Sequence, residues 1–387
     1  MQAIYASSDQ SQFLLQFKKS IDIDNTASSG CDSNGVPSYR GTKSWNRSTD
    51  CCRWDGVTCN ELSGEVIGLD LSCSQLHGVI NSNSSLFQLS HLKWLNLACN
   101  DFSSSLISSV DFASVIPSNV SASLTILNLG STNLYGKCPA DIFQLPNLVR
   151  VELTNKRDLY GYLSDVKWNT TTSTLSYLAL SESDLESNQL TGQLYDFQYQ
   201  SIQRIYLSGN KLDGPVPKSV SKLVNLALLD LSSNNFGGVV QASMFSNCNQ
   251  LQTFDLSNNN ILLITDGVNS TLPQSVAFLF LSSCGIKDLD FLVPANNLYK
   301  LDPSENLLHG DIFSDKKGYN WSQRLFYLNL SYNSLIDLSQ IPLPNLLYLD
   351  LSSCLLQGPV VIPPASVQVF MIPDNYLTGE SHHQYAN

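Results

Sequence analysis

One pattern of apolar residues recurs from about residue 66 almost to the end of the chain. Its frame is LxxLxLxxNxL, as in HLKWLNLACNDF and NLALLDLSSNNF, and most copies are 21 to 27 residues apart. A copy this short adds one strand and cannot bury its apolar edge alone, so the copies must stack into a solenoid. The last apolar strand position of the thirteen copies falls at Leu71, Leu97, Leu129, Leu153, Leu180, Leu207, Leu231, Leu256, Leu281, Pro303, Leu330, Leu351 and Ile372.

Within each copy the two xLxL leucines point inward, and the residues between them alternate outward onto a curved sheet. With strands about 4.8 Å apart, thirteen copies make a strip on the order of 60 Å long. An asparagine follows the last leucine by three places in many copies, and its amide can bond backbone groups in the tight turn. These structural asparagines are Asn100, Asn210, Asn234, Asn259, Asn306, Asn333 and Asn375. Cys284 and Cys354 replace the asparagine in two copies, where a weak thiol donor predicts less firmly held turns.

A second signature, LxGxV/I and often Pro, follows many copies, for example LHGVI, LDGPVP and LQGPV. Glycine permits a tight turn, and proline suits an edge that donates no hydrogen bond. This variant resembles the plant extracellular leucine-rich repeats. The resemblance implies an α/β solenoid, a leucine-rich-repeat superhelix of about 13 repeats with a parallel concave sheet, a second short sheet at the LxGxI/VP turns and a helical, disulfide-bearing N-terminal cap.

Two places break the repeat. Between Leu97 and Leu129 the interval is 32 residues, and the surplus DFASVIPSNVSAS predicts a longer convex loop. In LALSESDLESNQL both Leu180 and Leu185 fit the last strand position, because Leu185 also precedes Asn188 at the usual offset. Either this copy carries a five-residue bulge or most of one repeat has been lost; the spacing of 22 residues from Leu185 to Leu207 favours loss.

Residues 9–62 differ from the repeats and predict the cap that a solenoid needs at its end. Phe13, Leu14, Phe17 and Ile21 share one helical face, and SWNRSTDCCRWDGVTC follows. This segment resembles the cap of plant receptor-like proteins and receptor kinases, and the resemblance implies two disulfides, Cys52 with Cys59 and Cys51 with Cys31. Disulfides imply an oxidising compartment. We expect residues 1–8 to be a leftover leader or disordered, 63–380 to be the repeats and 381–387 an irregular tail without a C-terminal cap.

Four further cysteines lie within the repeats. Cys73 and Cys99 occupy the same offset in neighbouring copies, so stacking brings them within reach of a disulfide. The alternative, which we favour, is a pair of small buried thiols. Cys138 and Cys248 have no equivalent neighbour and are interpreted as free or buried.

Charge and composition exclude several classes of protein. The formal net charge of −12 is the wrong sign for binding nucleic acid. No stretch reaches the roughly 18 to 20 apolar residues of a membrane-spanning helix, and MQAIYASS is too short for a secretory leader, so we expect a truncated start. Seven glycosylation sequons agree with secretion to the cell surface or beyond. They lie at Asn46, Asn83, Asn119, Asn169, Asn269, Asn320 and Asn329, of which Asn329 alone is expected on the concave face.

The sequence contains no recognisable set of catalytic residues beyond those that the repeat itself explains. The sequence has no phosphate loop, dinucleotide fingerprint or GxSxG elbow, and its histidines occupy turns, a loop and the tail. Asp70, Asp230, Asp255, Asp302 and Asp350 form an acidic column, which we interpret as a solvated column that keeps the sheet soluble rather than as a calcium or acid–base site. We expect neither an enzyme nor a cofactor or metal site.

The outward positions of the predicted sheet carry large aromatic and charged residues, the types that dominate binding interfaces. We predict ligand binding at Trp94, Arg150, Glu152, Tyr177, Arg204, Tyr206, Phe278, Phe280, Tyr327 and Tyr348. One cluster extends from Arg150 to Tyr206, and the other from Phe278 to Tyr348. The alternative is that these side chains only cover neighbouring strands.

The segments 44–59, 72–78 and 81–97 resemble the opening of plant leucine-rich-repeat receptor-like proteins of the leaf-mould-resistance type. That resemblance implies a cell-surface immune receptor that senses a pathogen protein or peptide and signals through a partner receptor kinase. Members usually carry more repeats, a C-terminal cap and a membrane helix, so we expect a truncated ectodomain here. The alternative is a secreted inhibitor of microbial cell-wall-degrading enzymes, similar to polygalacturonase-inhibiting proteins; a peptide-hormone receptor fragment is a third possibility.

Overall fold

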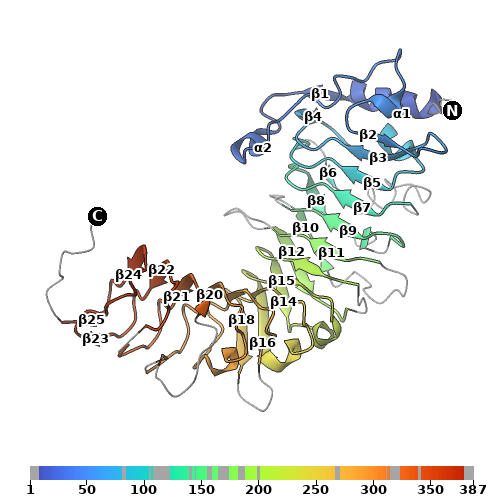
Figure 1. Cartoon of the computed structure of the whole chain (residues 1–387). Helices are drawn as coiled ribbons and strands as arrows, with labels where there is room; N and C mark the ends of the chain where they lie inside the picture. Colours follow the sequence, from blue (N-terminus) through green and yellow to red (C-terminus); the bar gives the residue numbers. More distant parts are fainter. Residues whose placement is uncertain are drawn as a thin grey trace. The chain divides into compact units, whose positions relative to one another are not determined.

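The computed structural model describes residues 8–80, 84–103, 106–107, 123–138, 142–143, 145–154, 159–163, 174–181, 188–197, 201–265, 271–310, 312–313, 323–338 and 341–378. The chain divides into two compact units, Met1–Leu212 and Asp213–Asn387 (Figure 1). Each unit is a stack of copies in which one strand follows another in chain order.

The main sheet of the first unit consists of short parallel strands, one for each copy. They are β3 (Val66–Asp70), β5 (Trp94–Asn96), β7 (Ile126–Asn128), β9 (Arg150–Glu152), β11 (Tyr177–Ala179) and β13 (Arg204–Tyr206). Equivalent residues pair in register, for example Leu69 with Leu95 and Leu95 with Leu127. The cap strand β2 (Val57–Cys59) joins β3 antiparallel.

The second unit repeats the arrangement. Its main-sheet strands are β15 (Leu228–Asp230), β17 (Thr253–Asp255), β19 (Phe278–Phe280), β20 (Lys300–Asp302), β21 (Tyr327–Asn329), β22 (Tyr348–Asp350) and β24 (Val369–Met371). Successive strands in this unit again pair parallel and in register. Each predicted copy thus contributes its strand, which confirms the parallel solenoid.

The predicted second sheet forms at the LxGxV/I turns. In the first unit it contains β6 (Leu106–Ile107), β8 (Tyr135–Lys137), β10 (Leu159–Tyr162) and β12 (Gln189–Gln193). Strand β14 (Lys211–Gly214) pairs through Asp213 and Gly214 with β16 (Asn235–Gln241), which pairs with β18 (Asn260–Ile264). Farther along, β23 (Gln357–Gly358) pairs with β25 (Tyr376–Leu377).

The core of each unit is a column of aliphatic side chains from the main-sheet strands, closed on the other side by short 3₁₀ turns. Leu69, Ile205 and Leu349 are among the fully buried strand residues. The described turns are η1 (Cys51–Arg53), η2 (Ser85–Gln88), η5 (Lys218–Lys222), η6 (Ala242–Phe245) and η7 (Asp290–Leu292). From η6, Phe245 packs on Phe254 with ring centroids 4.4 Å apart. Large apolar side chains therefore fill the space between sheet and turns.

Asparagine amides connect the turns of successive copies. Asn100 donates from Nδ2 to the carbonyls of Leu97 in its own copy (2.9 Å) and Leu71 in the preceding one (2.7 Å). Its Oδ1 accepts the N–H groups of Ser74 (3.1 Å) and Leu76 (2.9 Å). Nδ2 donation to the carbonyl of the last strand residue of the same copy recurs at Asn210, Asn234, Asn259, Asn306, Asn333 and Asn375. One amide thus satisfies backbone groups of two neighbouring turns.

At the break near Leu180 the structure shows one strand. Strand β11 pairs directly with β13, and Leu180 is its buried last leucine. Asn188 donates to the Leu180 carbonyl (2.8 Å), the bond that the asparagine three places on makes in other copies. This geometry assigns the last strand position of the copy to Leu180, and residues 182–187, which bear on the choice between a bulge and a lost repeat, lie outside the described residues. Leu185 lies outside the described residues, as does most of the surplus segment expected as a convex loop.

The cap begins with helix α1 (Ser8–Ser20), which buries Leu14 and Phe17. Strand β1 (Ile21–Ile23) pairs antiparallel with β4 (Leu76–Gly78), and α2 (Ser29–Ser33) follows. Trp45 and Trp54 stack with ring centroids 5.6 Å apart.

Gly56 is the glycine of the WDGV motif in the cap, and its surroundings explain why this position needs glycine. Its φ is +75°, and a Cβ there would lie 2.1 Å from the carbonyl oxygen of Asp70. The Gly56 carbonyl accepts the Asp70 N–H at 2.8 Å, so the cap backbone lies directly against the first repeat strand. Only glycine combines this backbone conformation with this contact.

One of the two disulfides implied by the resemblance is wrong. Cys52 pairs with Cys59 as implied, but Cys31 pairs with Cys73 of the first repeat, and Cys51 is a buried free cysteine. The reason is that α2 places Cys31 over the turn that follows β3, where Cys73 lies. The favoured pair of buried thiols at Cys73 and Cys99 is therefore wrong for Cys73, and Cys99 is a half-buried thiol. Cys248 and Cys138 are buried.

Candidate ligand-binding face

The residues that alternate outward from the main-sheet strands form what we call the open face of each unit. All ten predicted ligand-binding residues lie on it, and none is buried. Arg204 and Phe278 are exposed and the other eight are half-buried. Placement follows from the strand alternation, because the leucines on either side of each residue occupy the core.

In the first unit, charged and aromatic side chains join across strands β9, β11 and β13. Arg150 forms a 2.6 Å ion pair with Glu152 and lies with its guanidinium 3.8 Å from the centroid of the Tyr177 ring. Tyr177 in turn packs against Tyr206 with centroids 5.5 Å apart. Burial, followed by the charge of Glu152, raises the pKa of Tyr177. The structure thus brings together the predicted first cluster, with Arg204 paired to Tyr177 in register.

Trp94 stands apart from that cluster. Ile126 on β7 separates it from Arg150 in the strand register. Its indole lies over Gly68, where a Cβ would be 1.9 Å from Trp94 Cε2. At this position the alternative interpretation fits, since the side chain covers the neighbouring strand.

In the second unit, a lysine lies between two aromatic rings. Lys300 Nζ is 4.3 Å from the Tyr327 centroid and 5.5 Å from that of Phe280. Tyr327 stacks on Tyr348 with centroids 4.3 Å apart and an interplanar angle of 10°. We call these four residues, Phe280, Lys300, Tyr327 and Tyr348, the aromatic–lysine group. Burial is the main reason that the pKa of Tyr327 is raised.

The predicted second cluster therefore differs in two members. Phe278 stacks instead on Tyr299, with centroids 6.3 Å apart, and Tyr299 lies against Phe326. Lys300, which the predicted cluster omitted, lies at its centre. The sequence does indicate that Lys300 points outward, because Lys300 precedes a strand leucine just as Tyr327 does.

The aspartate column has a structural role that the sequence analysis missed. In the second unit Asp230, Asp302 and Asp350 each accept the N–H and the hydroxyl of the serine two residues on. Asp350 is buried, so the column is not simply solvated. The carboxylates close the turn at the strand end, and the recurring spacing of an aspartate two residues before a serine indicates this role in the sequence.

On the open face of the second unit, the carboxyl group of Asp255 has a strongly raised pKa. Burial raises its pKa to about 6, and the negative charge of Asp230 on the neighbouring strand adds to the effect. The two residues face each other in register, Asp230 on β15 and Asp255 on β17. Like charges on adjacent strands thus accumulate along this face of the second unit.

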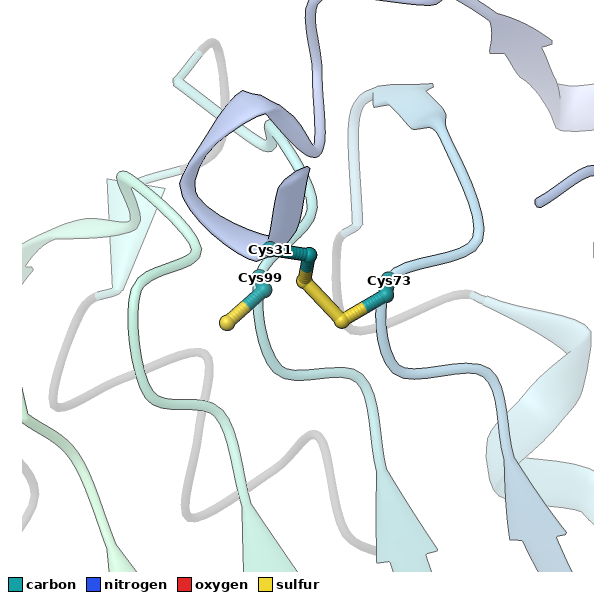
Figure 2. A group of neighbouring side chains, drawn as sticks. All are labelled: Cys31, Cys73 and Cys99. Carbon is teal, nitrogen blue, oxygen red and sulfur yellow. A yellow bond between two sulfur atoms is a disulfide. The ribbon is translucent and has the colours of Figure 1, made fainter. Parts of the chain in front are cut away.

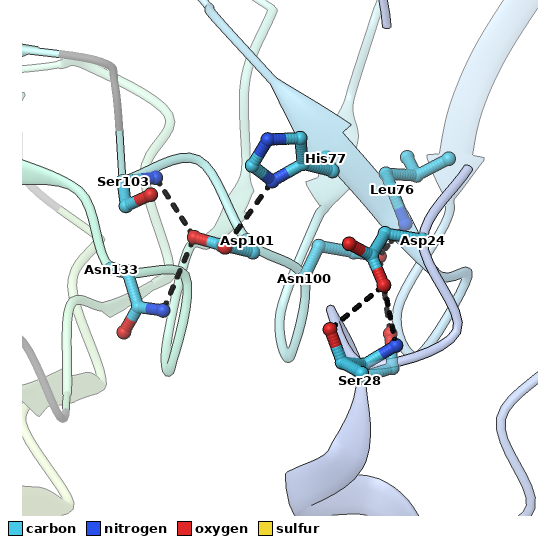
Figure 3. Close-up of polar contacts among 9 residues, drawn as sticks. Asp24, Ser28, Leu76, His77, Asn100, Asp101, Ser103 and Asn133 are labelled. Carbon is cyan, nitrogen blue, oxygen red and sulfur yellow. Dashed lines mark hydrogen bonds and ion pairs between the residues drawn. The ribbon is translucent and has the colours of Figure 1, made fainter. Parts of the chain in front are cut away.

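Away from the open face, polar contacts fasten the cap to the first two copies. The Ser28 hydroxyl of the cap accepts the Gln75 N–H of the first copy at 2.9 Å. Between the first and second copies, His77 Nδ1 lies 3.2 Å from Asp101 Oδ2 (Figure 3). The other oxygen of Asp101 accepts from Ser103 N–H (3.0 Å) and Asn133 Nδ2 (3.2 Å). Burial opposes ionisation of Asp101, but these hydrogen bonds prevail and lower its pKa. His77 therefore has a structural role in its turn.

Two sequon asparagines lie in the described residues. Asn46 is exposed, whereas Asn329 lies on the open face, where Nδ2 donates to Asp302 (3.1 Å) and Oδ1 accepts from Ser331. Asn83, Asn119, Asn169, Asn269 and Asn320 lie outside the described residues. No helix in the described part of the chain is long and apolar enough to cross a membrane.

Two family models match the chain. The Leucine rich repeat N-terminal domain matches residues 7–60, and the Leucine Rich Repeat matches residues 201–223 and 250–274. Receptor-like protein 6 of Arabidopsis thaliana is 32% identical over 299 residues, which covers 70% of this chain and 26% of that protein. Receptor-like protein Cf-9 of Solanum pimpinellifolium is 35% identical over 239 residues, covering 43% of this chain and 28% of that protein. The chain thus spans about a quarter of the length of these two relatives.

Solved structures share the fold. The crystal structure of PEPR1-AtPEP1 matches with a TM-score of 0.54 and 21% identity, over 95% of this chain and 59% of that one. A plant ice-binding protein matches with a TM-score of 0.52 and 24% identity, over 86% of this chain and 89% of that one. At these identities the likeness concerns the fold alone. The solenoid, its disulfide-bonded cap and the similarity to named relatives show that the chain is a leucine-rich-repeat protein related to the plant receptor-like proteins.

Proposed function

We propose that the chain is part of the ligand-binding ectodomain of a plant cell-surface receptor-like protein, and that its open face binds a protein or peptide from a pathogen. The observation that carries the proposal is the kind of side chain on the open face. Arginine, lysine and stacked tyrosines occupy positions that a merely soluble sheet fills with small polar groups. Relatives named as receptor-like proteins support the same class.

Two disulfides, one within the cap and one between the cap and the first repeat, support an extracellular location, because such bonds persist in oxidising compartments. Signalling through a receptor-kinase partner belongs to the same proposal. It concerns the whole receptor, of which this chain resembles a part.

A binding assay with paired tyrosine variants tests the proposal. The purified chain is immobilised, and size-fractionated secreted proteins of a fungal leaf pathogen are passed over it. Tyr177→Ala and Tyr327→Ala remove aromatic side chains from the two open-face groups and should weaken binding at least tenfold in one case. Tyr160→Ala is the matched control, since Tyr160 is 50% exposed on the second sheet.

Equal losses in all three variants, or none, would exclude the open face as the binding surface. Purified fungal polygalacturonases form a second arm of the assay. Binding and inhibition of these enzymes, with the same sensitivity to Tyr177→Ala or Tyr327→Ala and no binding of other secreted proteins, would favour the inhibitor over the receptor.

A further inference from the structure

Three cysteines meet where the cap joins the first two repeats. Cys31 of α2 is bonded to Cys73 of the first copy, and the free cysteine Cys99 belongs to the second copy. Their three sulfur atoms all lie within 4.8 Å of one another (Figure 2). A thiol thus lies beside a disulfide, close enough to reach it by rotation of a side chain.

Cys73 and Cys99 are equivalent residues of adjacent copies. Each follows the last strand leucine by two places, and their φ angles are 53° and 56°. The Cys73 N–H donates to the carbonyl of Ala98 at 3.0 Å, so the two turns run side by side. Adjacent copies are about 4.8 Å apart, which lies inside the Cα separation that disulfides span.

We propose that the Cys99 thiol exchanges with the Cys31–Cys73 disulfide and that the chain therefore has two covalent forms of its cap. Cys99, as thiolate, attacks Sγ of Cys73; the Cys73–Cys99 bond forms as the Cys31–Cys73 bond breaks. The electron pair leaves on Sγ of Cys31, which takes up the proton that Cys99 lost. One disulfide and one thiol remain, so the step needs no oxidant or reductant.

The two forms tie different parts of the chain together. In the first, the disulfide fastens α2 to the first copy; in the second, it joins the first copy to the second and leaves α2 without a covalent tether. Hydrogen bonds from Gln75 N–H to the Ser28 hydroxyl (2.9 Å) and from Tyr39 N–H to the Cys73 carbonyl (3.0 Å) still hold the segment. The exchange therefore loosens the α2 segment while the repeats stay folded.

The surroundings of Cys99 make the exchange slow at neutral pH. Burial raises the pKa of its thiol and the charge of Glu152 acts in the same direction, while a hydrogen bond with Ser131 opposes them. Because the thiolate is the attacking species, little of it is present at pH 7. The two forms should persist long enough to be trapped by an alkylating reagent.

Disulfide mapping of the intact wild-type chain tests the proposal. The protein is incubated at pH 8.5 without added thiol or oxidant, blocked with N-ethylmaleimide at intervals and digested with trypsin. Arg40, Arg53 and Lys93 place Cys31, Cys73 and Cys99 on three different peptides. We expect labelled Cys31 to appear as labelled Cys99 declines, with their sum constant at one per chain. Cys99 labelled in full and Cys31 unlabelled at every time would overturn the proposal.

Serine variants provide an independent arm. Cys31→Ser should contain a Cys73–Cys99 disulfide and Cys99→Ser should lock the Cys31–Cys73 bond, whereas Cys248→Ser, which alters a buried cysteine outside the group, should leave the exchange unchanged. Labelling of both Cys73 and Cys99 in Cys31→Ser would contradict the proposal. If a variant fails to accumulate, the wild-type time course still decides.

Discussion

At the scale of the residue, each structural asparagine of the repeat, which we call a ladder asparagine, can make several hydrogen bonds with one side-chain amide. Asn306 donates to the carbonyls of Leu281, Pro303 and Ser304, and its Oδ1 accepts the N–H groups of Cys284 and Ile286. These groups belong to the turns of two neighbouring copies, and the Asn306 side chain between them is buried. An apolar residue of similar size would take away the acceptor of the Cys284 and Ile286 N–H groups. The carbonyls of Pro303 and Ser304 would still accept from Asn333 Nδ2 and the Ser283 N–H.

Asn306→Ala should therefore lower the free energy of unfolding by about 2–4 kcal/mol, because buried polar groups lose their partners. Asn345→Ala is the matched control, since Asn345 is exposed and donates one bond, to the Gln323 carbonyl. It should cost less than about 1 kcal/mol. Urea unfolding measures both. Similar losses in the two variants would show that the ladder bonds do not stabilise the fold.

Cys284 gives the converse experiment. Its thiol contacts the carbonyls of Leu256 (3.8 Å) and Ser282 (3.6 Å), where an amide would donate two stronger bonds. Cys284→Asn should raise the free energy of unfolding by about 1 kcal/mol. Cys248→Asn places the same amide at a buried site outside the ladder and should destabilise the protein. A destabilised Cys284→Asn would mean that the turn has adapted to sulfur.

The residues that were predicted and those that were missed differ in how local their interactions are. The asparagines were predictable because a fixed offset within the repeat sets their partners. The partner of Cys31 was not, since it depends on where α2 lies against the first repeat. The position of Lys300 between Phe280 and Tyr327 depends likewise on rotamers across three strands.

At the scale of the element, the period of the sequence placed every main-sheet strand, because each copy must align its leucines with those of the next. The break near Leu180 shows where this reasoning fails. Leu180 and Leu185 both satisfy the frame, and only the pairing of β11 with β13 distinguishes them. A pattern of about 24 residues can fit two leucines equally well, whereas register is decided by contacts with the neighbouring strand.

The carboxylates on neighbouring strands predict a pH dependence of stability. The pKa of Asp255 rises from 3.8 to about 6 on folding, through burial and then the charge of Asp230. Because its pKa is raised, Asp255 binds a proton more tightly in the folded state than in the unfolded state. Its contribution to the free energy of unfolding is therefore fully present below about pH 3.8 and is lost as the pH rises through 6. Asp255→Asn removes the titration but keeps an oxygen for the Ser257 N–H.

The variant should therefore unfold like the wild type at pH 4 and be more stable by on the order of 2 kcal/mol at pH 7.5. Asp337→Asn, at an exposed position, should track the wild type at both values. Thermal unfolding at the two pH values measures the difference. If Asp255→Asn is no more stable than the wild type at pH 7.5, the negative charge of Asp255 does not destabilise the folded protein.

At the scale of the whole molecule, we expect the stability of each copy to depend on its immediate neighbours and not on distant copies. In a solenoid each copy contacts only its neighbours, so a local change fades along the stack. The cap lies at one end of the first unit, where η1 and β2 carry the Cys52–Cys59 bond and β2 pairs with β3. Damage to that bond should loosen the first copies and leave distant ones as they were.

Replacing Cys52 and Cys59 together with serine tests this locality. The closed loop is short, so we expect a loss of about 2–3 kcal/mol in local stability. Hydrogen exchange of the amides in β2, β3 and β5 should accelerate roughly 30-fold or more, since each 1.4 kcal/mol is a factor of ten. Exchange in β19 to β22 should stay within experimental error of the wild type, because many copies separate those strands from the cap. Uniform acceleration along the chain would instead mean that the copies unfold as one cooperative body, with the cap setting the stability of every strand.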